Sequence, residues 1–170
     1  YDEATAVVVR GPDVYIAGKF YGTTASFGNV VVTNTTPSAQ SMSDVYVARL
    51  LDTGSTASFV WAQSAGGPDN ESVNALAVNG PNVYVAGQFD GLTATFGGTT
   101  RTNANPNLAT AFGHLDCFIA KLSDTGTSGR IAWARSAGGT GDDVPVALAA
   151  IGASVYLAGN FGSYTARFGG

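Results

Sequence analysis

The sequence predicts an all-β protein made of tandem four-stranded antiparallel blades, and three observations support this fold class. A unit of about 72 residues repeats along the chain. Each unit holds apolar segments of strand length that alternate with period two and are bounded by Gly, Asn, Asp or Pro. Glycine provides 23 of the 170 residues, and Gly or Pro interrupts nearly every ten-residue window, which disfavours helices.

The repeat is visible in segments that return after steps of 69 or 72 residues. The clearest copies are Val14–Phe20, Val83–Phe89 and Val155–Phe161; Asp52-Thr53-Gly54 and Asp124-Thr125-Gly126; Trp61 and Trp133. The spacing divides the chain into three parts: unit 1 (1–67), unit 2 (68–139) and the first half of unit 3 (140–170).

Four apolar segments of unit 2 define the expected sheet. In chain order they are Ala75–Val78, Val83–Phe89, Cys117–Leu122 and Ile131–Ser136. Turn-forming residues of the type Gly-Pro-Asn and Asp-Thr-Gly join them, with loops of about four residues, so we expect an antiparallel meander.

Two further features of this meander carry structural expectations. The small residues in the middle of the second segment, such as Ala86 and Gly87, predict close approach of a neighbouring sheet. The connection before the third segment varies in length between units, so 29–43 and 98–115 are expected to be surface loops that could carry binding.

Four-stranded sheets that recur at a fixed period and are apolar on both faces are typical of β-propeller blades. A linear β-solenoid is the alternative, but its coils repeat at roughly 20 to 30 residues. About 2.4 units fit into 170 residues, fewer than the four or more blades of a closed propeller. We therefore expect a part of a larger array, or a chain that closes its edges against copies of itself. The first residue is Tyr1, which suggests a processed or partial chain.

The composition excludes several functional classes. Charged residues are 12% and the net charge is −4, which argues against a nucleic-acid partner. No apolar run reaches the roughly 20 residues of a membrane span. One Cys and one His exclude a disulfide scaffold and a metal site that needs several such ligands.

Acidic residues are the first candidates for a functional site. Several recur between units, and a recurring acid favours a role in the fold, such as the turn-initiating Asp52 and Asp124 or the strand-preceding Asp44 and Asp116. The alternative is Ca²⁺, which takes six to eight oxygen ligands. The Gly-rich segments 66–71 and 138–143 offer such oxygens on four candidate metal ligands: Asp69, Glu71, Asp142 and Asp143.

Other candidate residues favour packing over chemistry. His114 and Cys117 could form a thiolate pair, but Cys117 takes the place of Val45 in unit 1, which indicates a buried apolar residue. The recurring Trp and Tyr positions are expected in the core or between blades, whereas Tyr21 and Tyr164 are candidates for an exposed contact. No catalytic or cofactor-binding motif is present, so neither site is predicted.

The pattern in unit 2 resembles the bacterial SBBP-type β-propeller repeat family, as found in secreted and cell-surface Bacteroidetes proteins with type IX sorting domains. The residues that carry the resemblance are Asp116–Leu122, Asp124-Thr125-Gly126, Trp133, Gly138-Gly139, Asp142-Asp143, Ala147–Ala149 and Val155–Phe161. The resemblance implies an extracellular or cell-surface location and a structural, adhesive or binding role.

These observations predict a non-enzymatic extracellular repeat module that contacts itself, further repeats of the same protein, or surface glycans. One alternative is a filament subunit completed by strands from neighbouring chains, because open strand edges recruit other chains. The other is a carbohydrate-active propeller enzyme, with Asp90 and Asp142 as the acids to test.

Overall fold

The computed structural model describes residues 1–36, 42–105 and 114–169. Within these ranges the chain is all-β, with fifteen strands, no helix and antiparallel pairing throughout. No helix in the described part of the chain could therefore cross a membrane. The all-β class predicted from the repeat is confirmed.

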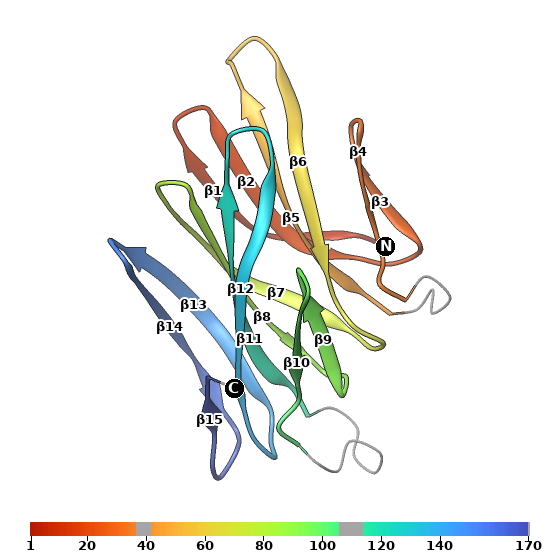
Figure 1. Ribbon diagram of the computed structural model, residues 1–170, viewed down its shortest axis with the longest axis vertical. Coiled ribbons are helices and arrows are strands. Elements are labelled where there is room, and N and C mark those ends of the chain that lie inside the picture. Colours follow the sequence, from red (N-terminus) through yellow and green to blue (C-terminus); the bar gives the residue numbers. More distant parts are fainter. Residues whose placement is uncertain (37–41, 106–113, 170) are drawn as a thin grey trace.

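Two large sheets and a hairpin follow one another along the chain (Figure 1). The first sheet has the order β1-β2-β5-β6, with the strands β1 (Glu3–Arg10), β2 (Asp13–Phe20), β5 (Asp44–Asp52) and β6 (Ala57–Ala65). The second has the order β15-β12-β11-β8-β7, with β7 (Glu71–Asn79), β8 (Asn82–Phe89), β11 (Asp116–Asp124), β12 (Gly129–Gly138) and β15 (Arg167–Phe168). The hairpin joins β13 (Asp143–Ile151) to β14 (Ser154–Phe161).

The four expected segments of unit 2 all lie on strands, in the predicted antiparallel order β7-β8-β11-β12. The β11–β12 connection has the predicted four residues, whereas β7 and β8 are joined by only two, of which Gly80 has a φ of 57°. A glycine with positive φ followed by proline is typical of a II′ hairpin turn. The same geometry recurs at Gly11, with a φ of 58°.

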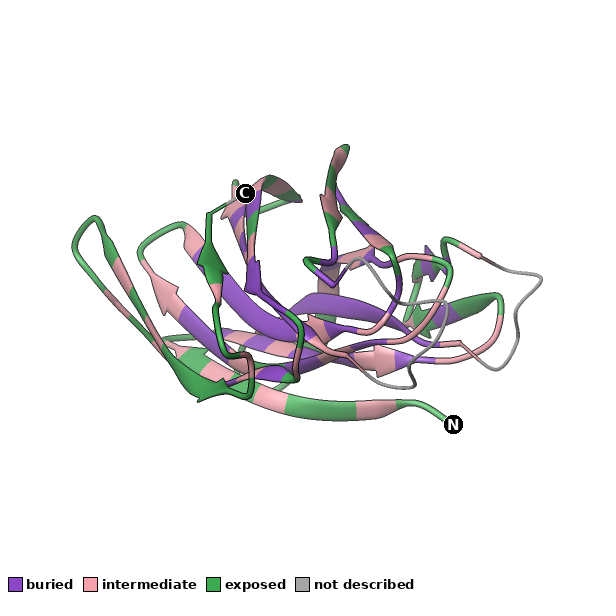
Figure 2. Ribbon diagram, turned by 90° about the horizontal axis from the view of Figure 1, so that it is seen from below, coloured by how far each residue is buried: buried purple, intermediate pink, exposed green. Residues whose placement is uncertain are grey.

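The sheets pack face to face, with β7 against β1 on one side and against β13 on the other. The main core lies between the first two sheets and includes Tyr15, Trp61, Phe96 and Phe118. Burial is deepest in the middle of this stack (Figure 2). At its ends, Val7 and Val9 of β1 are 63% and 65% exposed, and Tyr156 of β14 is 60% exposed.

The expectation of plain surface loops at 29–43 and 98–115 was wrong in part. Each segment begins with a strand that closes a small hairpin. These hairpins pair β3 (Thr24–Phe27) with β4 (Val30–Thr33), and β9 (Thr93–Phe96) with β10 (Thr99–Thr102). Phe27 packs on Tyr46 and Phe59, and Phe96 packs on Phe118, so these hairpins are anchored by aromatic contacts. Residues 37–41 and 106–113 of the two segments lie outside the described residues.

The reason for the small residues in the second segment of unit 2, which is β8, also differs from the prediction. A Cβ on Gly87 would lie 1.9 Å from the Ser72 carbonyl oxygen and 2.8 Å from the Phe118 ring. Both atoms belong to the same sheet, at a point where the register between β7 and β8 shifts. The glycine therefore accommodates a β-bulge of the adjacent strand and not a neighbouring sheet.

Candidate functional site

The most elaborate polar site joins unit 1 to the Asp124 turn of unit 2. Tyr15, Arg49 and Trp61 are directly opposite one another on β2, β5 and β6, so they form one row across the first sheet. The Asp124 carboxylate accepts a hydrogen bond of 2.6 Å from the Tyr15 hydroxyl and one of 3.1 Å from Trp61 Nε1. One carboxylate thus connects two strands of the preceding unit.

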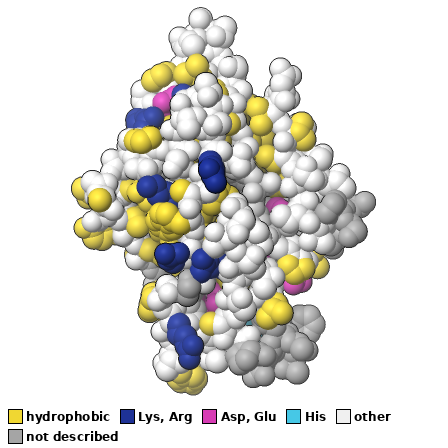
Figure 3. Space-filling view, viewed as in Figure 1, with side chains coloured by type: hydrophobic (Ala, Val, Ile, Leu, Met, Phe, Trp, Pro, Cys, Tyr) yellow, Lys and Arg dark blue, Asp and Glu magenta, His cyan; other side chains and the backbone are white. Residues whose placement is uncertain are grey.

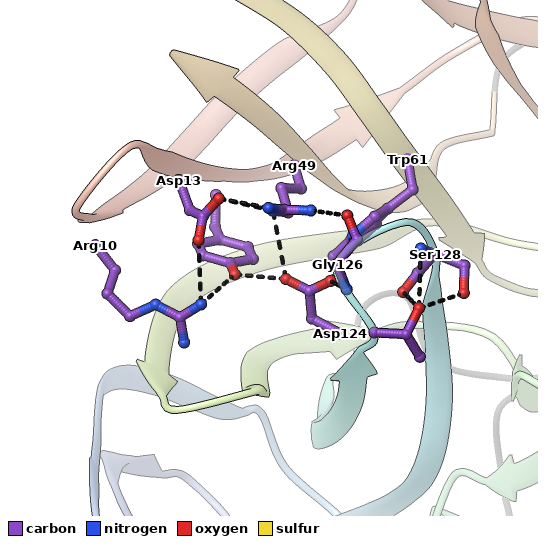
Figure 4. A network of polar contacts seen from close by, with 9 residues as sticks. Arg10, Asp13, Arg49, Trp61, Asp124, Gly126 and Ser128 are labelled. Atoms are coloured by element: carbon purple, nitrogen blue, oxygen red, sulfur yellow. Dashed lines mark hydrogen bonds and ion pairs between the residues drawn. The ribbon is translucent and has the colours of Figure 1, made fainter. Parts of the chain in front are cut away.

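Arg49 supplies the positive charge of this site. Figure 4 shows its guanidinium between Asp13 and the turn that contains Gly126. Arg49 lies 2.6 Å from Asp13 Oδ1 and 3.4 Å from Asp124 Oδ2, and it also donates to the Gly126 carbonyl oxygen. Arg10 adds a second cation 3.2 Å from Asp13. The pairing of these charges offsets the cost of placing them at a largely buried junction.

The pKa shifts follow from this geometry. Burial alone would raise the pKa of Asp124, but hydrogen bonds from Tyr15, Gly126 and Trp61, with the charge of Arg49, outweigh burial and lower it. Burial and the hydrogen bond to Asp124 raise the pKa of Tyr15 to about 12. The pair is therefore a neutral phenol that donates to a carboxylate, a geometry suited to holding elements together.

The same row exists in unit 2, where Tyr84, Lys121 and Trp133 are opposite one another on β8, β11 and β12. The rings of Tyr84 and Trp133 lie 6.2 Å apart at 56°, and those of Tyr15 and Trp61 lie 6.2 Å apart at 55°. Within the described ranges no carboxylate reaches this second row. The second row is therefore the counterpart of the Tyr15–Arg49–Trp61 row, but no Asp turn contacts it in the described residues.

Asp52 shows what the turn does by itself. Its Oδ1 accepts a 2.8 Å hydrogen bond from the Gly54 amide, and Asp124 Oδ1 accepts the matching bond from Gly126. The predicted turn-initiating role is thus confirmed for both residues. The prediction missed the second role of Asp124, because only the fold brings Asp124 to Tyr15.

A second site at the same junction buries two carboxyl groups, those of Asp44 at the start of β5 and Glu71 at the start of β7. Both lie against Gly66, where a Cβ would meet Asp44 Oδ1 at 2.2 Å and Glu71 Oε2 at 2.7 Å. Thr35 donates to both oxygens of Asp44, and the Gly67 amide donates to Glu71. Gly66 is therefore needed because acidic side chains fill the space of its missing Cβ, whereas a Cβ on Gly67 would meet the Thr93 carbonyl oxygen at 2.1 Å.

The next junction repeats this arrangement with Asp116 and Asp143, which are both buried. A Cβ on Gly138 would meet Asp116 Oδ1 at 2.0 Å, and the Ser163 hydroxyl donates to Asp143. Ala104 stands where unit 1 has Thr35, so Asp116 Oδ1 has no hydrogen-bond partner among the described residues. Recurrence at both junctions indicates a role in the fold.

Burial governs the pKa values of these carboxyl groups. It raises the pKa of Glu71 to about 9, and the nearby charge of Asp44 adds to the effect. It raises the pKa of Asp116 to about 6, and it raises the pKa of Asp44 as well. At neutral pH Glu71 is therefore protonated in the folded protein.

The four predicted calcium ligands do not form one cluster. Glu71 and Asp143 are buried at different junctions, while Asp142 is exposed and accepts from the Leu115 amide. Asp69 lies beside Gly91. In the part of the chain that the structure describes, no three His, Cys, Asp or Glu side chains come together as a metal site. The calcium hypothesis stays a prediction.

A polar cavity of about 300 Å³ contains Asp90, the acid that the enzyme hypothesis singled out. Both Asp90 oxygens accept from Asn70, at 2.7 Å from its amide and 3.3 Å from Nδ2. Lys19, also in this cavity, lies 3.5 Å from Glu3 and over the Tyr21 ring. The Asp90 and Lys19 side chains are thus engaged with other residues of the protein, whereas Glu71, which also lines the cavity, has one oxygen, Oε1, without a hydrogen-bond partner among the described residues.

The remaining candidates behave as packing or surface residues. Cys117 is 1% exposed, and burial raises the pKa of its thiol to about 11. This confirms the prediction that Cys117 is a buried apolar residue and not a thiolate. His114 offers its carbonyl oxygen to the Asn103 side chain. Tyr164 is fully exposed as expected, whereas Tyr21 is half-buried.

Sequence reasoning missed Asn34 and Asn103, which occupy the same position 69 residues apart. Each donates from Nδ2 to a carbonyl across its loop, to Met42 and to His114 respectively, and accepts from the amide two residues later. Their recurrence inside segments of variable length was a signal that these segments are anchored.

Comparison with known proteins adds no identity: no family model matches the chain, and no curated protein matches it. The resemblance to SBBP-type repeats therefore stays a prediction.

The buried carboxyl groups predict that stability falls as pH rises. Between about pH 4.5 and 9, Glu71 keeps its proton in the folded state but loses it on unfolding, so the folded state loses stability by up to about 1.4 kcal/mol per pH unit. Glu71→Gln should flatten this decline above about pH 7, where Asp116 is already largely ionised. Urea unfolding followed by tryptophan fluorescence at pH 5 to 9 measures it.

Asp142→Asn is the matched control, because it changes an exposed carboxylate and keeps the oxygen that accepts from Leu115. We expect this variant to retain the wild-type pH dependence. Equal slopes for the wild type and Glu71→Gln would contradict the assignment of a buried proton to Glu71.

Proposed function

We propose that the chain is a non-enzymatic extracellular repeat module with a structural or adhesive role, built from β-propeller-type blades. The observation that carries the proposal is that buried acidic residues recur at the junctions between one unit and the next. The carboxyl pairs Asp44–Glu71 and Asp116–Asp143 occupy equivalent positions at successive junctions. Such repeated junctions are what an array of stacked units requires.

The stacking contacts support blades as the repeating element. The bridge between Gly66, which directly follows β6, and Thr95 of β9 recurs as the pairing of Gly138 of β12 with Arg167 of β15. Strand β15 is thus the copy of β9 in unit 3, docked in the same way on the preceding sheet. A four-stranded sheet that contacts both neighbours by the same residues is the arrangement of a propeller blade.

The surface charge fits a role without nucleic acid. On the face drawn in Figure 3, Lys and Arg side chains are dispersed among hydrophobic and uncharged side chains. Nucleic-acid binding rests on clustered cations that neutralise phosphates.

A screen for turnover tests the non-enzymatic assignment. Incubation of the wild type with panels of glycoside, peptide and ester substrates should give no turnover above background, because Asp90 in the polar cavity is already bonded to Asn70. Turnover by the wild type that Asp90→Asn or Asp142→Asn abolishes would contradict the proposal and favour the carbohydrate-active alternative.

A filament subunit is the second candidate function, favoured by the free edge of β14. In the described residues β14 pairs with β13 alone, whereas its counterparts β2 and β8 each pair on both edges. An unpaired edge beside exposed apolar side chains recruits further strands. Light scattering should then show mass that grows with concentration; a strictly monomeric particle up to about millimolar concentration would rule this candidate out.

A further inference from the structure

A cavity of about 340 Å³ opens between the second sheet and unit 3. Its apolar walls include Ile119 and Ala137 from the sheet, and Leu157 and Phe168 from unit 3. Phe168 is 71% exposed. The cavity is open to solvent, and exposed apolar surface of this kind often marks a site of contact with another element or protein.

The equivalent place between units 1 and 2 is filled, with a void of only about 10 Å³. Val47, Ala65, Val85 and Phe96 line it, and they are the repeat counterparts of the four wall residues named above. The first sheet adds Val45, Tyr46, Gln63 and Ser64 to this lining, and the β11–β12 hairpin adds four apolar residues: Phe118, Ala120, Leu122 and Ile131. The hairpin is therefore the element that fills this space.

Phe96 shows the effect of the hairpin on one side chain. Its ring centroid lies 4.5 Å from that of Phe118, and it is only 1% exposed. Phe168 is the same residue in the next unit, and although its ring lies 5.1 Å from that of Phe161, it is not buried by a hairpin. Removing the exposed Phe168 ring from water is favourable, so the cavity favours an apolar occupant.

The edge of β14 fixes the direction of that occupant. In unit 2, β8 pairs with β11 from Phe89 opposite Asp116 to Asn82 opposite Ser123. The same register on β14 would place a hairpin's first strand along 161 to 154. This strand would satisfy backbone groups that have no ladder partner in the described residues.

The row of Tyr84, Lys121 and Trp133 adds polar groups to the apolar cavity and the β14 edge. Its rings already have the geometry that holds Asp124 at the first junction. Lys121 stands at the position of Arg49, so a cation is in place for a carboxylate. A hairpin on β14 would bring its Asp-x-Gly turn to this row, just as β11–β12 brings Asp124 to Tyr15.

We propose that the apolar cavity, the β14 edge and the Tyr84–Lys121–Trp133 row form one binding site for a β-hairpin of the chain's own repeat type, the counterpart of residues 116–139. The inference rests on the proposed role as a repeat module and names its partner. The hairpin contributes a Phe to the cavity, a strand to the edge and an Asp to the row.

The first sheet of a second folded copy does not fit this description. Its β5, which carries the Asp52 turn, is already paired with β2 on one edge and β6 on the other. Only a hairpin whose first strand has a free edge can pair with β14 and reach Tyr84 at the same time.

Titration calorimetry of the full 170-residue chain with a synthetic peptide of residues 116–139 tests the site. We expect one peptide bound per chain, with hydrogen exchange slowed at the amides of 154–161. The Asp124→Asn and Phe118→Ala forms of the peptide should each bind at least tenfold more weakly, because each removes one of the three contacts.

Variants of the chain distinguish specific binding at this site from nonspecific binding of the peptide. Tyr84→Phe removes the expected donor without changing shape, and it should weaken binding about tenfold. Tyr1→Phe makes the same change at an exposed residue of unit 1 and should leave binding unchanged. Circular dichroism confirms that each variant is folded.

Two results would overturn the inference. One is the absence of binding at millimolar peptide; the other is binding that neither Tyr84→Phe nor the peptide's Asp124→Asn weakens. Neither result would change the outcome of the turnover screen. Turnover in that screen would refute the proposed function, but it would not change the result of the peptide titration.

Discussion

The Asp124 carboxylate is the contact on which the junction between the first two units depends. It combines two hydrogen bonds from the preceding sheet with the bond that shapes its own turn. Arg49 lets this charge be buried, because Arg49 also pairs with Asp13 and the Gly126 carbonyl. Flat apolar sheet faces can slide over one another, whereas a directional charged contact fixes their relative position. Apolar burial drives the stacking, and the Asp turn sets its register.

The buried carboxyl groups at the junctions give the stack a second pH dependence, opposite in direction to that of the Asp124 site. Glu71 keeps a proton at neutral pH because burial penalises its charge, and it lies against a glycine that leaves room for it. This site loses stability as pH rises, whereas the Asp124 site loses stability as pH falls through the lowered pKa of its carboxylate. The two kinds of junction site together favour mildly acidic over neutral or alkaline conditions.

Much of the fold could be predicted from the repeat, because strand periodicity and turn residues are local signals. The order of β7, β8, β11 and β12 and the burial of Cys117 followed from them. The β9–β10 hairpin was missed because its strands are only four residues long and polar. The polar site around Asp124 was harder to predict, because a repeated Asp indicates only a turn. The hydrogen bond between Asp124 and Tyr15, 109 residues away, appears only when the sheets are stacked. The bulge opposite Gly87 is likewise a property of paired strands and not of one segment.

A double-mutant cycle between Tyr15→Phe and Asp124→Asn tests the central claim most directly. Urea unfolding of the wild type, both single variants and the double variant gives the coupling free energy of the two side chains. The account predicts a coupling of about 1–3 kcal/mol for this pair. It predicts less than about 0.5 kcal/mol for Tyr15→Phe with Asp52→Asn, the same turn without the contact between units. Additive effects at Tyr15 and Asp124 would contradict the claim that this turn joins the units.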